Sequence, residues 1–422
     1  MTKLVVGYGE KTITPPLGTD LTGFGFYLDR RAEKALDNLK ARALFLKQGE
    51  EKLLLVSCDL LSFVGEDADR IRRHISLAHD LPLAGVTLAC THTHSGPVAQ
   101  PLEGLGEADP AYRSSLDGMI LEAAGRAEAD ARECEFSHAI EAVEPIGYNR
   151  RNGDFSEIDP WLKMDIFTGG RGKIYLLNYA CHPVTIGPTP EISSDWPGAL
   201  IRRIEEKGDR AIFFQGFCGD IDPVTYLNRR GGGTAADLDF YGRLLSERIA
   251  KAERFAVVHP SPELVSVESR IRLPLAVCPE DGIEADARFF LEKNNAFPGA
   301  DRFTDEWKKI ARSRNREFRK KPYIDNVPMQ AAAIGGVPML MLPGEVFCSY
   351  GTDLRKEWPN LLSFGYANGN AGYFPTRSAY DNPDDYACYC APKFYSIFPF
   401  EKEIQSLLLG ESRKLLKKVA GA

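Results

Sequence analysis

Apolar runs alternate with amphipathic stretches along this chain, and three pairs of apolar runs predict β-hairpins. Residues 41–61 hold two such runs on either side of 48–51, a spacing typical of antiparallel strands joined by a tight turn. The same pattern recurs at 162–183 and at 327–345, each with adjacent glycines near its centre. The chain is therefore expected to contribute antiparallel strand pairs to its sheet structure.

Helical periodicity fills much of the sequence outside these hairpins. Apolar residues recur every three to four positions, and acidic residues, Pro or Gly mark several of the ends. The predicted helices cover 66–80, 109–131, 196–208, 235–253 and 401–419. A charged helical stretch at about 283–320 is expected to cap or flank the core. Hairpins and strand–helix alternation together predict an α/β protein with a mixed β-sheet core flanked by helices. Because no Pro/Ser-rich linker divides the chain, we expect one domain over 1–422.

The composition narrows the function without identifying it. The net charge is −7 over 422 residues and both signs are spread throughout, so no basic stripe points to a nucleic acid partner. No window is long and apolar enough to span a membrane, and the first residues lack the features of a signal peptide. The nine cysteines are scattered and mostly inside apolar runs, which is typical of free thiols in a reducing compartment. We therefore expect a cytoplasmic protein.

Two of the seven histidines, His92 and His94, follow directly on an apolar run in the segment LACTHTHSGP. Residues two apart in a strand lie about 6.5 Å apart on the same face, so the two imidazoles are expected to face one way. Neutral imidazole is a common zinc ligand, and such a pair can share a metal or divide metal binding and proton transfer between them. A hydrogen-bonded pair without a metal is the alternative.

The segment LLNYACHP repeats this arrangement, with His182 at the end of an apolar strand and Pro183 stopping it. Ligands at the ends of neighbouring strands are how open α/β sheets build their sites. A zinc site with two histidines also needs a carboxylate and an open position, and Glu345 follows the apolar strand and Pro-Gly turn of MLMLPGE. Glu345 is also expected to open a helix, where a glutamate is common without any function.

Further loops extend the set of candidates. Asp220 and Asp222 in GDIDP could bind a metal, act as a general base, or only shape the turn before Pro223. Asp195 could equally be the N-cap of the helix that it precedes. The Tyr- and Asn-rich loop after LLSFG offers phenols, which contact ligands well but also pack without them. Its candidates are Tyr366, Tyr373, Tyr380 and Tyr386.

Several of these motifs, in their order along the chain, resemble those of the neutral/alkaline (non-lysosomal) ceramidases. The matching segments are TITPPLGTDLTGFG, ARALFL, VSCDLL, CTHTHSGP, YNRR, NYACHP, SSDWPG, CGDIDP, LPGE and the Tyr/Asn loop. Those zinc enzymes hydrolyse the amide between a fatty acid and a long-chain base. The resemblance implies the fold of their N-terminal catalytic domain, with a helical insertion at about 283–320 and without their C-terminal immunoglobulin-like domain.

The resemblance also implies roles for individual residues. The implied zinc ligands are His92, His182, Glu345 and Tyr373. Tyr373 is placed by matching NGNAGYFPT to the family's Asn- and Tyr-containing loop. His94 would line the site as a catalytic group, for proton transfer or for the transition state. Substrate contacts would come from Arg150 and Asn149 of the YNRR motif and from Tyr386.

One departure from the family changes the expected chemistry. The family carries a serine, regarded as catalytic, in its Gly-Asp-x-Ser-Pro motif, where this chain has Asp222 in GDIDP. A carboxylate near Zn²⁺ is a competent base, so we expect Asp222 to take the proton of a zinc-activated water and pass it to the leaving amine. His94 or Arg150 would stabilise the oxyanion. The predicted function is zinc-dependent hydrolysis of the amide bond of a small N-acyl substrate, a class that includes lipid-like molecules.

Two alternatives to this function stay open on the sequence. The same site could hydrolyse a different amide, an ester or a lactone. The alternative from another class of protein is a non-catalytic relative. It would have kept the metal- and ligand-binding site but lost catalysis together with the serine. The residue pattern gives neither the acyl group, nor the amine, nor the oligomeric state.

Overall fold

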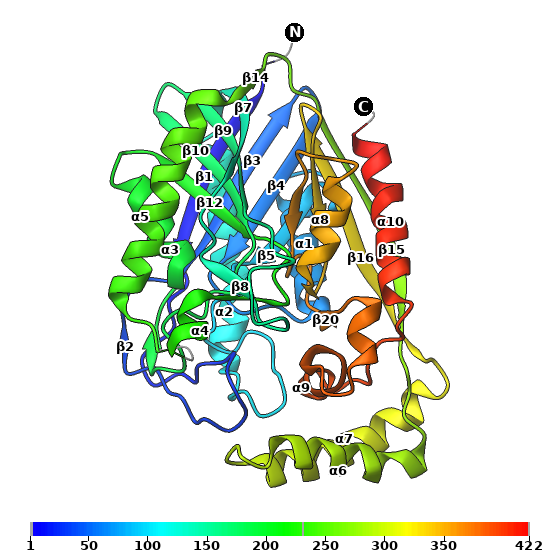
Figure 1. The fold of residues 1–422 in the computed structure, drawn as a ribbon. Coiled ribbons are helices and arrows are strands. Elements are labelled where there is room, and N and C mark those ends of the chain that lie inside the picture. Colours follow the sequence, from blue (N-terminus) through cyan, green and yellow to red (C-terminus); the bar gives the residue numbers. More distant parts are fainter. Residues whose placement is uncertain (1–2, 230–231, 421–422) are drawn as a thin grey trace.

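The larger β-sheets pack around a shared apolar core in the computed structural model, which describes residues 3–229 and 232–420 (Figure 1). The core between them includes Leu44, Ile212 and Met339, one from each of three sheets. Helices cover the outer faces of the sheets (Figure 1). The predicted class, a mixed β-sheet core flanked by helices, is confirmed.

The first sheet carries the histidine pair at one end. Its strands are β1 (Val5–Thr12), β3 (Lys40–Gln48), β4 (Glu51–Cys58), β5 (Val86–Cys90) and β6 (Arg132–Glu133). They lie in the order β5-β4-β3-β1-β6 and are antiparallel except for β4 and β5. β3 and β4 form the predicted hairpin, with Gly49 in the left-handed region of its turn. Helices α1 (Gly65–Ala78) and α2 (Pro110–Ala129) pack against this sheet.

The second sheet carries His182. Its strands are β7 (Glu135–Ala142), β9 (Trp161–Gly169), β10 (Gly172–Tyr179), β12 (Arg210–Gln215) and β14 (Val257–His259), in the order β12-β10-β9-β7-β14. β9 and β10 form the second predicted hairpin, whereas β10 and β12 run parallel. The parallel pair needs a crossover connection, which α3 (Asp195–Glu205) provides. α3 packs on β12 and on α5 (Ala235–Ala252).

The third sheet leads to Glu345. Its strands are β15 (Leu264–Pro274), β16 (Tyr323–Ile334), β17 (Val337–Met341) and β19 (Leu362–Phe364), in that order. β16 and β17 form the third predicted hairpin, because Gly335 and Gly336 supply the two positive φ angles of its turn. Helix α10 (Ile404–Val419) covers this sheet, and α8 (Cys348–Arg355) lies in the crossover between β17 and the parallel β19.

Short pairings hold the loops at the ends of these sheets. They join β2 (Lys34–Ala35) to β11 (Glu191–Ile192), β8 (Gly147–Asn149) to β13 (Ile221–Pro223), and β18 (Glu345–Val346) to β20 (Tyr373–Phe374). The expectation that Glu345 opens a helix is therefore wrong. Its pairing with β20 keeps the backbone extended, and α8 begins only at Cys348.

The predicted helices are confirmed, with ends that shift by a few residues. Asp109 caps α2, because its carboxylate accepts hydrogen bonds from the backbone N–H groups of Ala111 and Tyr112. Ser194, and not Asp195, is the N-cap of α3. Shorter helices are α4 (Val224–Arg229) and α9 (Ala391–Phe394). The charged stretch at 283–320 forms α6 (Ile283–Asn294) and α7 (Ala300–Phe318), which lie side by side at one end of the molecule (Figure 1).

The state of the cysteines and the character of the helices agree with the sequence analysis. All nine cysteines lie in the described part of the chain and are free thiols. Among the described residues, no helix has both the length and the apolar character needed to cross a membrane. The cytoplasmic location and the extent of the domain stay predictions.

Candidate functional site

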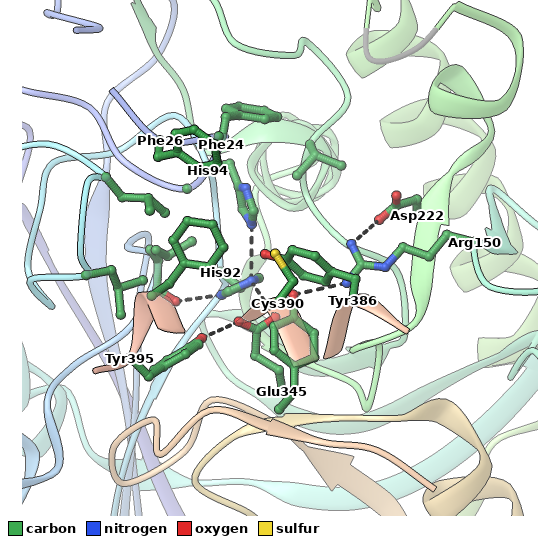
Figure 2. Close-up of a pocket in the computed structure, with 18 of the residues that line it drawn as sticks. Phe24, Phe26, His92, His94, Arg150, Asp222, Glu345, Tyr386, Cys390 and Tyr395 are labelled. Atoms are coloured by element: carbon green, nitrogen blue, oxygen red, sulfur yellow. Dashed lines mark hydrogen bonds and ion pairs between the residues drawn. The ribbon is translucent and has the colours of Figure 1, made fainter. Parts of the chain in front are cut away.

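Loops from all three sheets bring His92, His182 and Glu345 to one point. His92 follows β5, His182 follows β10 and Glu345 begins β18. The Nε2 atom of His92 lies 3.4 Å from Oε2 of Glu345, and Nε2 of His182 lies 3.5 Å from the same oxygen. All three side chains are buried. The structure thus brings together three of the predicted metal ligands (His92 and Glu345 in Figure 2).

Backbone carbonyl groups fix the orientation of two imidazole rings. Nδ1 of His92 lies 2.8 Å from the carbonyl oxygen of Leu61, and Nδ1 of His182 lies 3.1 Å from that of Ile221. A carbonyl only accepts, so each Nδ1 donates, and in the neutral ring each Nε2 keeps its lone pair. This tautomer, held by a carbonyl on the far nitrogen, is the one in which metal-binding histidines are found.

His94 also points into this cluster, but not for the reason that strand alternation gives. β5 ends at Cys90, so both histidines lie beyond the strand. His92 has a φ of 69°, in the left-handed region that a non-glycine residue rarely occupies. Nε2 of His94 nevertheless lies 3.2 Å from Nε2 of His92 (Figure 2). Ring nitrogens of His92, His94 and His182 lie within 4.8 Å of one another.

The spacing and the unsatisfied atoms of this cluster fit a metal ion. In a tetrahedral zinc site with bonds of about 2.0–2.1 Å, ligand atoms lie about 3.4 Å apart. The separations of 3.2, 3.4 and 3.5 Å around His92 and Glu345 match that value. Within the described part of the chain, Nε2 of His182 and Oε2 of Glu345 are buried without a hydrogen-bond partner. Buried polar atoms left unsatisfied are costly, and a cation held between them would remove that cost.

Burial favours the neutral form of two of the clustered histidines, His92 and His94. It lowers the pKa of His92 from its ordinary value. Burial lowers the pKa of His94 well below its ordinary value, and the neighbouring imidazoles of His92 and His182 add to this effect. A metal-binding histidine must be neutral, and this environment holds His92 and His94 in that form. His182 differs: burial would lower its pKa, but its contacts with Cys218 and Glu345 outweigh burial and raise the pKa to about 10, so a cation bound at its Nε2 would displace a proton.

Glu345 is held by tyrosines on the side away from the histidines. β18 and β20 run parallel with Glu345 opposite Tyr373, and the Tyr395 hydroxyl donates to Oε1 of Glu345 (Tyr395 in Figure 2). Burial raises the pKa of Tyr373 well above its ordinary value, and the nearby Glu345 raises it further. Tyr395 was not among the predicted residues. It follows helix α9, and no spacing in the sequence relates it to Glu345.

Asp222 and Arg150 form a charged pair beside the cluster. Nη1 of Arg150 lies 3.3 Å from Oδ1 of Asp222, and the same oxygen lies 3.8 Å from Nδ1 of His182 (Figure 2 shows the Arg150–Asp222 contact). Nη2 of Arg150 donates to the carbonyl of Gly219 at 2.7 Å and to the Tyr373 hydroxyl at 3.0 Å. Burial would lower the pKa of Arg150, but Asp222 and Tyr373 outweigh it, so the pKa lies well above its ordinary value and the guanidinium stays charged.

Asn149 lies next to Arg150 in sequence but is not among the cavity-lining residues. Its side chain is fully buried, and Oδ1 accepts from the backbone N–H groups of Arg151 and Asn152 at 3.0 and 3.2 Å. Nδ2 donates to Asp220 at 3.1 Å. The structure therefore gives Asn149 a role in holding this loop, and the predicted contact with a substrate finds no support in its position.

The other candidates divide between the cavity and its surroundings. The Tyr386 ring packs edge-on against Tyr373, with 5.6 Å between ring centroids, and lines the cavity. Tyr366 stacks on His92 at 3.8 Å between centroids and supports that ring from behind. Neither Asp195 nor Tyr380 lines the cavity.

A cavity of about 300 Å³ opens onto the histidines. The residues around the inner end of the cavity are His92, His94, Arg150, Asp222, Glu345, Tyr373, Tyr386 and Tyr395. Most of the remaining cavity wall consists of aromatic and aliphatic side chains, and the segment from α6 to α7 contributes Asn294 and Phe297. The apolar wall includes Phe24, Phe26, Leu61, Leu102, Leu105, Val184, Phe297 and Phe394 (Phe24 and Phe26 in Figure 2).

The sheets and the strand-end site define a neutral ceramidase-like fold. The neutral ceramidase from Pseudomonas aeruginosa superposes with a TM-score of 0.73 at 17% sequence identity, over 99% of this chain and 75% of that one. A ceramidase complexed with C2 superposes with a TM-score of 0.74 at 16% identity, over 99% and 76%. No protein-family model and no curated protein matches the sequence. At these identities the likeness establishes the fold, which confirms the fold that the motifs implied.

Proposed function

We propose that this protein is a metal-dependent hydrolase that cleaves an amide (N-acyl) bond with a zinc-activated water. The observation that carries the proposal is the cluster of His92, His94, His182 and Glu345 beside a cavity, with ring nitrogens and a carboxylate oxygen at ligand-to-ligand distances. The ceramidase-like fold supports the choice of an amide as the bond that is cleaved.

The donor set offers two candidates for a fourth protein ligand, which would bind a zinc ion in addition to the position that its water ligand needs. His92, His182 and Glu345 form the common part of the set. Tyr373 lies opposite Glu345 in the β18–β20 pair, and its phenol is the ligand that the motifs implied. His94 is the alternative that geometry favours, because its Nε2 lies 3.2 Å from that of His92. Metal content after replacement of each residue separates the two.

Bound zinc would supply a Lewis acid and lower the pKa of a water ligand from that of bulk water to about 7. The chain itself supplies the other groups. Asp222 lines the cavity and would receive the proton of the attacking water, then pass it to the leaving amine. Arg150 would face the negative charge that develops on the carbonyl oxygen, because its guanidinium is charged and lines the same cavity. Its contacts with Gly219 and Tyr373 hold it in place for that task.

The size and lining of the cavity suggest the class of substrate. Ligand pockets span about 300–1,000 Å³, and this cavity lies at the lower limit. We expect an apolar acyl group of modest length to lie against Phe24, Phe26 and Phe394, which line the cavity, and we expect its volume to be too small for two long alkyl chains together. We therefore propose a small N-acyl substrate, lipid-like in its acyl half.

The test combines metal analysis with hydrolysis of a substrate panel. Untreated protein should contain about one zinc per chain, and N-acyl amines with short to medium acyl chains should be cleaved to an acid and an amine. A chelator should abolish this activity, and added zinc should restore it. Ester or lactone cleavage without amide cleavage would replace the proposed bond type. Bound zinc without hydrolysis of any panel member would favour a non-catalytic relative.

A further inference from the structure

Arg30 is a buried cation that is held by backbone carbonyls alone. It is 9% exposed, and its guanidinium donates from Nη2 to the carbonyls of Thr22 at 2.6 Å and His94 at 2.9 Å. Nη1 donates to the carbonyl of Thr189 at 3.2 Å. In the described part of the chain, no carboxylate forms an ion pair with this guanidinium.

Other buried guanidinium groups of the protein do have a carboxylate partner. Arg42 pairs with Asp59 at 2.7 Å, and Arg72 pairs with Asp69 at 3.3 Å. Burial lowers the pKa of Arg30 to about 10, so its guanidinium is still charged near neutral pH. A buried charge without a counter-charge costs stability. The position of Arg30 therefore calls for an explanation other than stabilisation of the fold.

The three carbonyls belong to three loops around the cavity. Thr22 lies in the loop that supplies Phe24 to the cavity wall, and His94 lies in the loop after β5. Thr189 lies in the connection from β10 to α3, which supplies Val184 to the same wall. One guanidinium thus ties together three loops, each of which contributes to the cavity lining.

The ring of His94 is held differently from the rings of His92 and His182. Nδ1 of each of those two donates to a backbone carbonyl, whereas Nδ1 of His94 is buried without a partner among the described residues. The backbone N–H of His94 makes only a long contact, 3.4 Å to the carbonyl of Pro183. Packing, and not a hydrogen bond at Nδ1, must therefore set the direction of the His94 ring.

The loop that carries Arg30 supplies this packing. The ring of Phe24 meets the ring of His94 edge to face, with 5.1 Å between the centroids (Figure 2). At Gly23 the chain passes so close that a Cβ atom there would lie 2.6 Å from Cγ of His94. The guanidinium carbon of Arg30 lies 4.7 Å from the centroid of the Phe24 ring. Arg30 therefore contacts both the backbone of His94 and the ring that packs against it.

We propose that Arg30 is a positioning residue that holds the ring of His94 in the metal cluster. It acts through two links, the hydrogen bond to the His94 carbonyl and the contact with Phe24. Arg30 is not among the residues that line the cavity, so it would not touch a substrate itself. Any effect of Arg30 on turnover rests on the proposed function, whereas the clamp itself does not. The rival explanation is a loop staple with no consequence for His94.

The experiment compares Arg30→Met and Arg30→Lys with Arg31→Met. Methionine removes the charge and every donor, whereas lysine keeps the charge but replaces the planar fork by one ammonium group. The side chain of Arg31 is 73% exposed and pairs with Asp20 at 3.3 Å, so Arg31→Met is the matched control. Zinc affinity is measured against a competing chelator, turnover with an N-acyl substrate, and backbone hydrogen exchange by mass spectrometry of the metal-free protein.

We expect Arg30→Met to lower whichever property His94→Ala lowers, zinc affinity or turnover, by about tenfold, the effect of losing a partner that orients a ligand. The loss should be smaller in Arg30→Lys. In the double variant Arg30→Met, His94→Ala the two losses should not add, because Arg30 acts through His94.

Hydrogen exchange tests the clamp without reference to metal or substrate. In Arg30→Met, residues 22–27 and 93–97 should exchange about tenfold faster, because a charge-assisted hydrogen bond that opposes local opening is lost. Residues 41–47 of β3 should keep their exchange rate, and Arg31→Met should change none of these properties. Unchanged exchange at 22–27 and 93–97 would overturn the clamp, whatever the activity. Faster exchange in a protein without hydrolysis would contradict the hydrolase function and leave the clamp standing.

Three further results would overturn the positioning role. The first is additive losses in the double variant, the result that a loop staple predicts. The second is a property that His94→Ala lowers and Arg30→Met leaves unchanged. The third is full recovery in Arg30→Lys, which would show that the charge alone matters. Should Arg30→Met fail to fold, the same comparison and the same double variant are made with Arg30→Lys.

Discussion

Two buried histidines of this protein, His138 and His182, differ in a way that shows what a candidate metal site requires. His138 lies within β7, and its Nδ1 is 2.7 Å from Oδ1 of Asp165 on β9. Its Nε2 is buried without a partner in the described part of the chain, as is Nε2 of His182. An unsatisfied ring nitrogen is therefore not by itself evidence for a metal.

His182 differs from His138 in the groups that surround its unsatisfied ring nitrogen. His138 faces one carboxylate inside a sheet and lines none of the larger cavities. Nε2 of His182 shares a carboxylate oxygen with His92, has a further imidazole within 4.8 Å, and lies beside a cavity. The convergence of strand ends, and not the burial of one histidine, creates a place for a cation.

The paired replacements His182→Ala and His138→Ala test this comparison with the largest expected effect. We expect His182→Ala to lose bound zinc almost completely and with it all hydrolysis, because a tetrahedral site loses one of its nitrogen donors. Zinc per chain is measured by mass spectrometry of the purified protein.

His138→Ala is the matched control for this loss. It should keep about one zinc per chain while lowering the free energy of unfolding by about 1–3 kcal/mol, because the buried side chain of Asp165 loses its hydrogen-bond partner. Denaturant titration gives that value. Equal zinc contents in the two variants would contradict the distinction between His138 and His182.

Asp222→Asn sharpens the comparison by separating metal binding from catalysis. Asparagine keeps the size of the side chain but cannot take a proton, so turnover should fall about 10²–10⁴-fold, the usual contribution of a general base. Zinc content should not change. A turnover number equal to that of the parent protein would remove Asp222 from the proposed mechanism.

Tyr395→Phe probes the support of the cluster and not the cluster itself. It removes the hydroxyl that donates to Oε1 of Glu345 and leaves the ring in place. Partners of metal ligands typically contribute about 10–100-fold to metal affinity, so zinc affinity measured against a competing chelator should fall within that range. Tyr389→Phe, which loses a hydroxyl bound to the backbone of Tyr380, is the control and should leave zinc affinity unchanged.

Asn149→Ala should have the smallest effect on the reaction. Its amide holds the backbone of Arg151 and Asn152 and the carboxylate of Asp220. Loss of these bonds should lower stability by about 1–3 kcal/mol, measured by thermal or denaturant unfolding, while KM for an N-acyl substrate stays within about twofold of the parent value at 25 °C. A large rise in KM at unchanged stability would restore the predicted substrate contact.

Much of the fold and part of the site could be predicted because the relevant signals are local. Apolar runs joined by Gly49 or by Gly335 and Gly336 specify hairpins whatever surrounds them. Histidines that follow an apolar strand must lie at its end, so the positions of His92 and His182 could be expected from their neighbours in sequence.

The remainder of the site depends on tertiary contacts that no spacing encodes. The left-handed backbone at His92 sets the direction of its ring, and strand alternation does not predict that conformation. Tyr395 reaches Glu345 only because the folded chain brings the residue after α9 beside the start of β18. Asn149 adjoins a cavity residue in sequence, yet its amide is bound to the loop backbone and to Asp220. The direction of that side chain is set by these tertiary contacts, so its position next to Arg150 in sequence does not predict it.

The most direct test is anomalous diffraction at the zinc edge on crystals of the untreated protein, together with zinc per chain in solution. We expect about one zinc per chain and a single strong peak bonded to Nε2 of His92, Nε2 of His182 and Oε2 of Glu345, with bonds of about 2.0–2.2 Å. Purified protein that contains no zinc, or an anomalous peak located away from these three atoms, would contradict the proposed metal centre and the hydrolase function built on it.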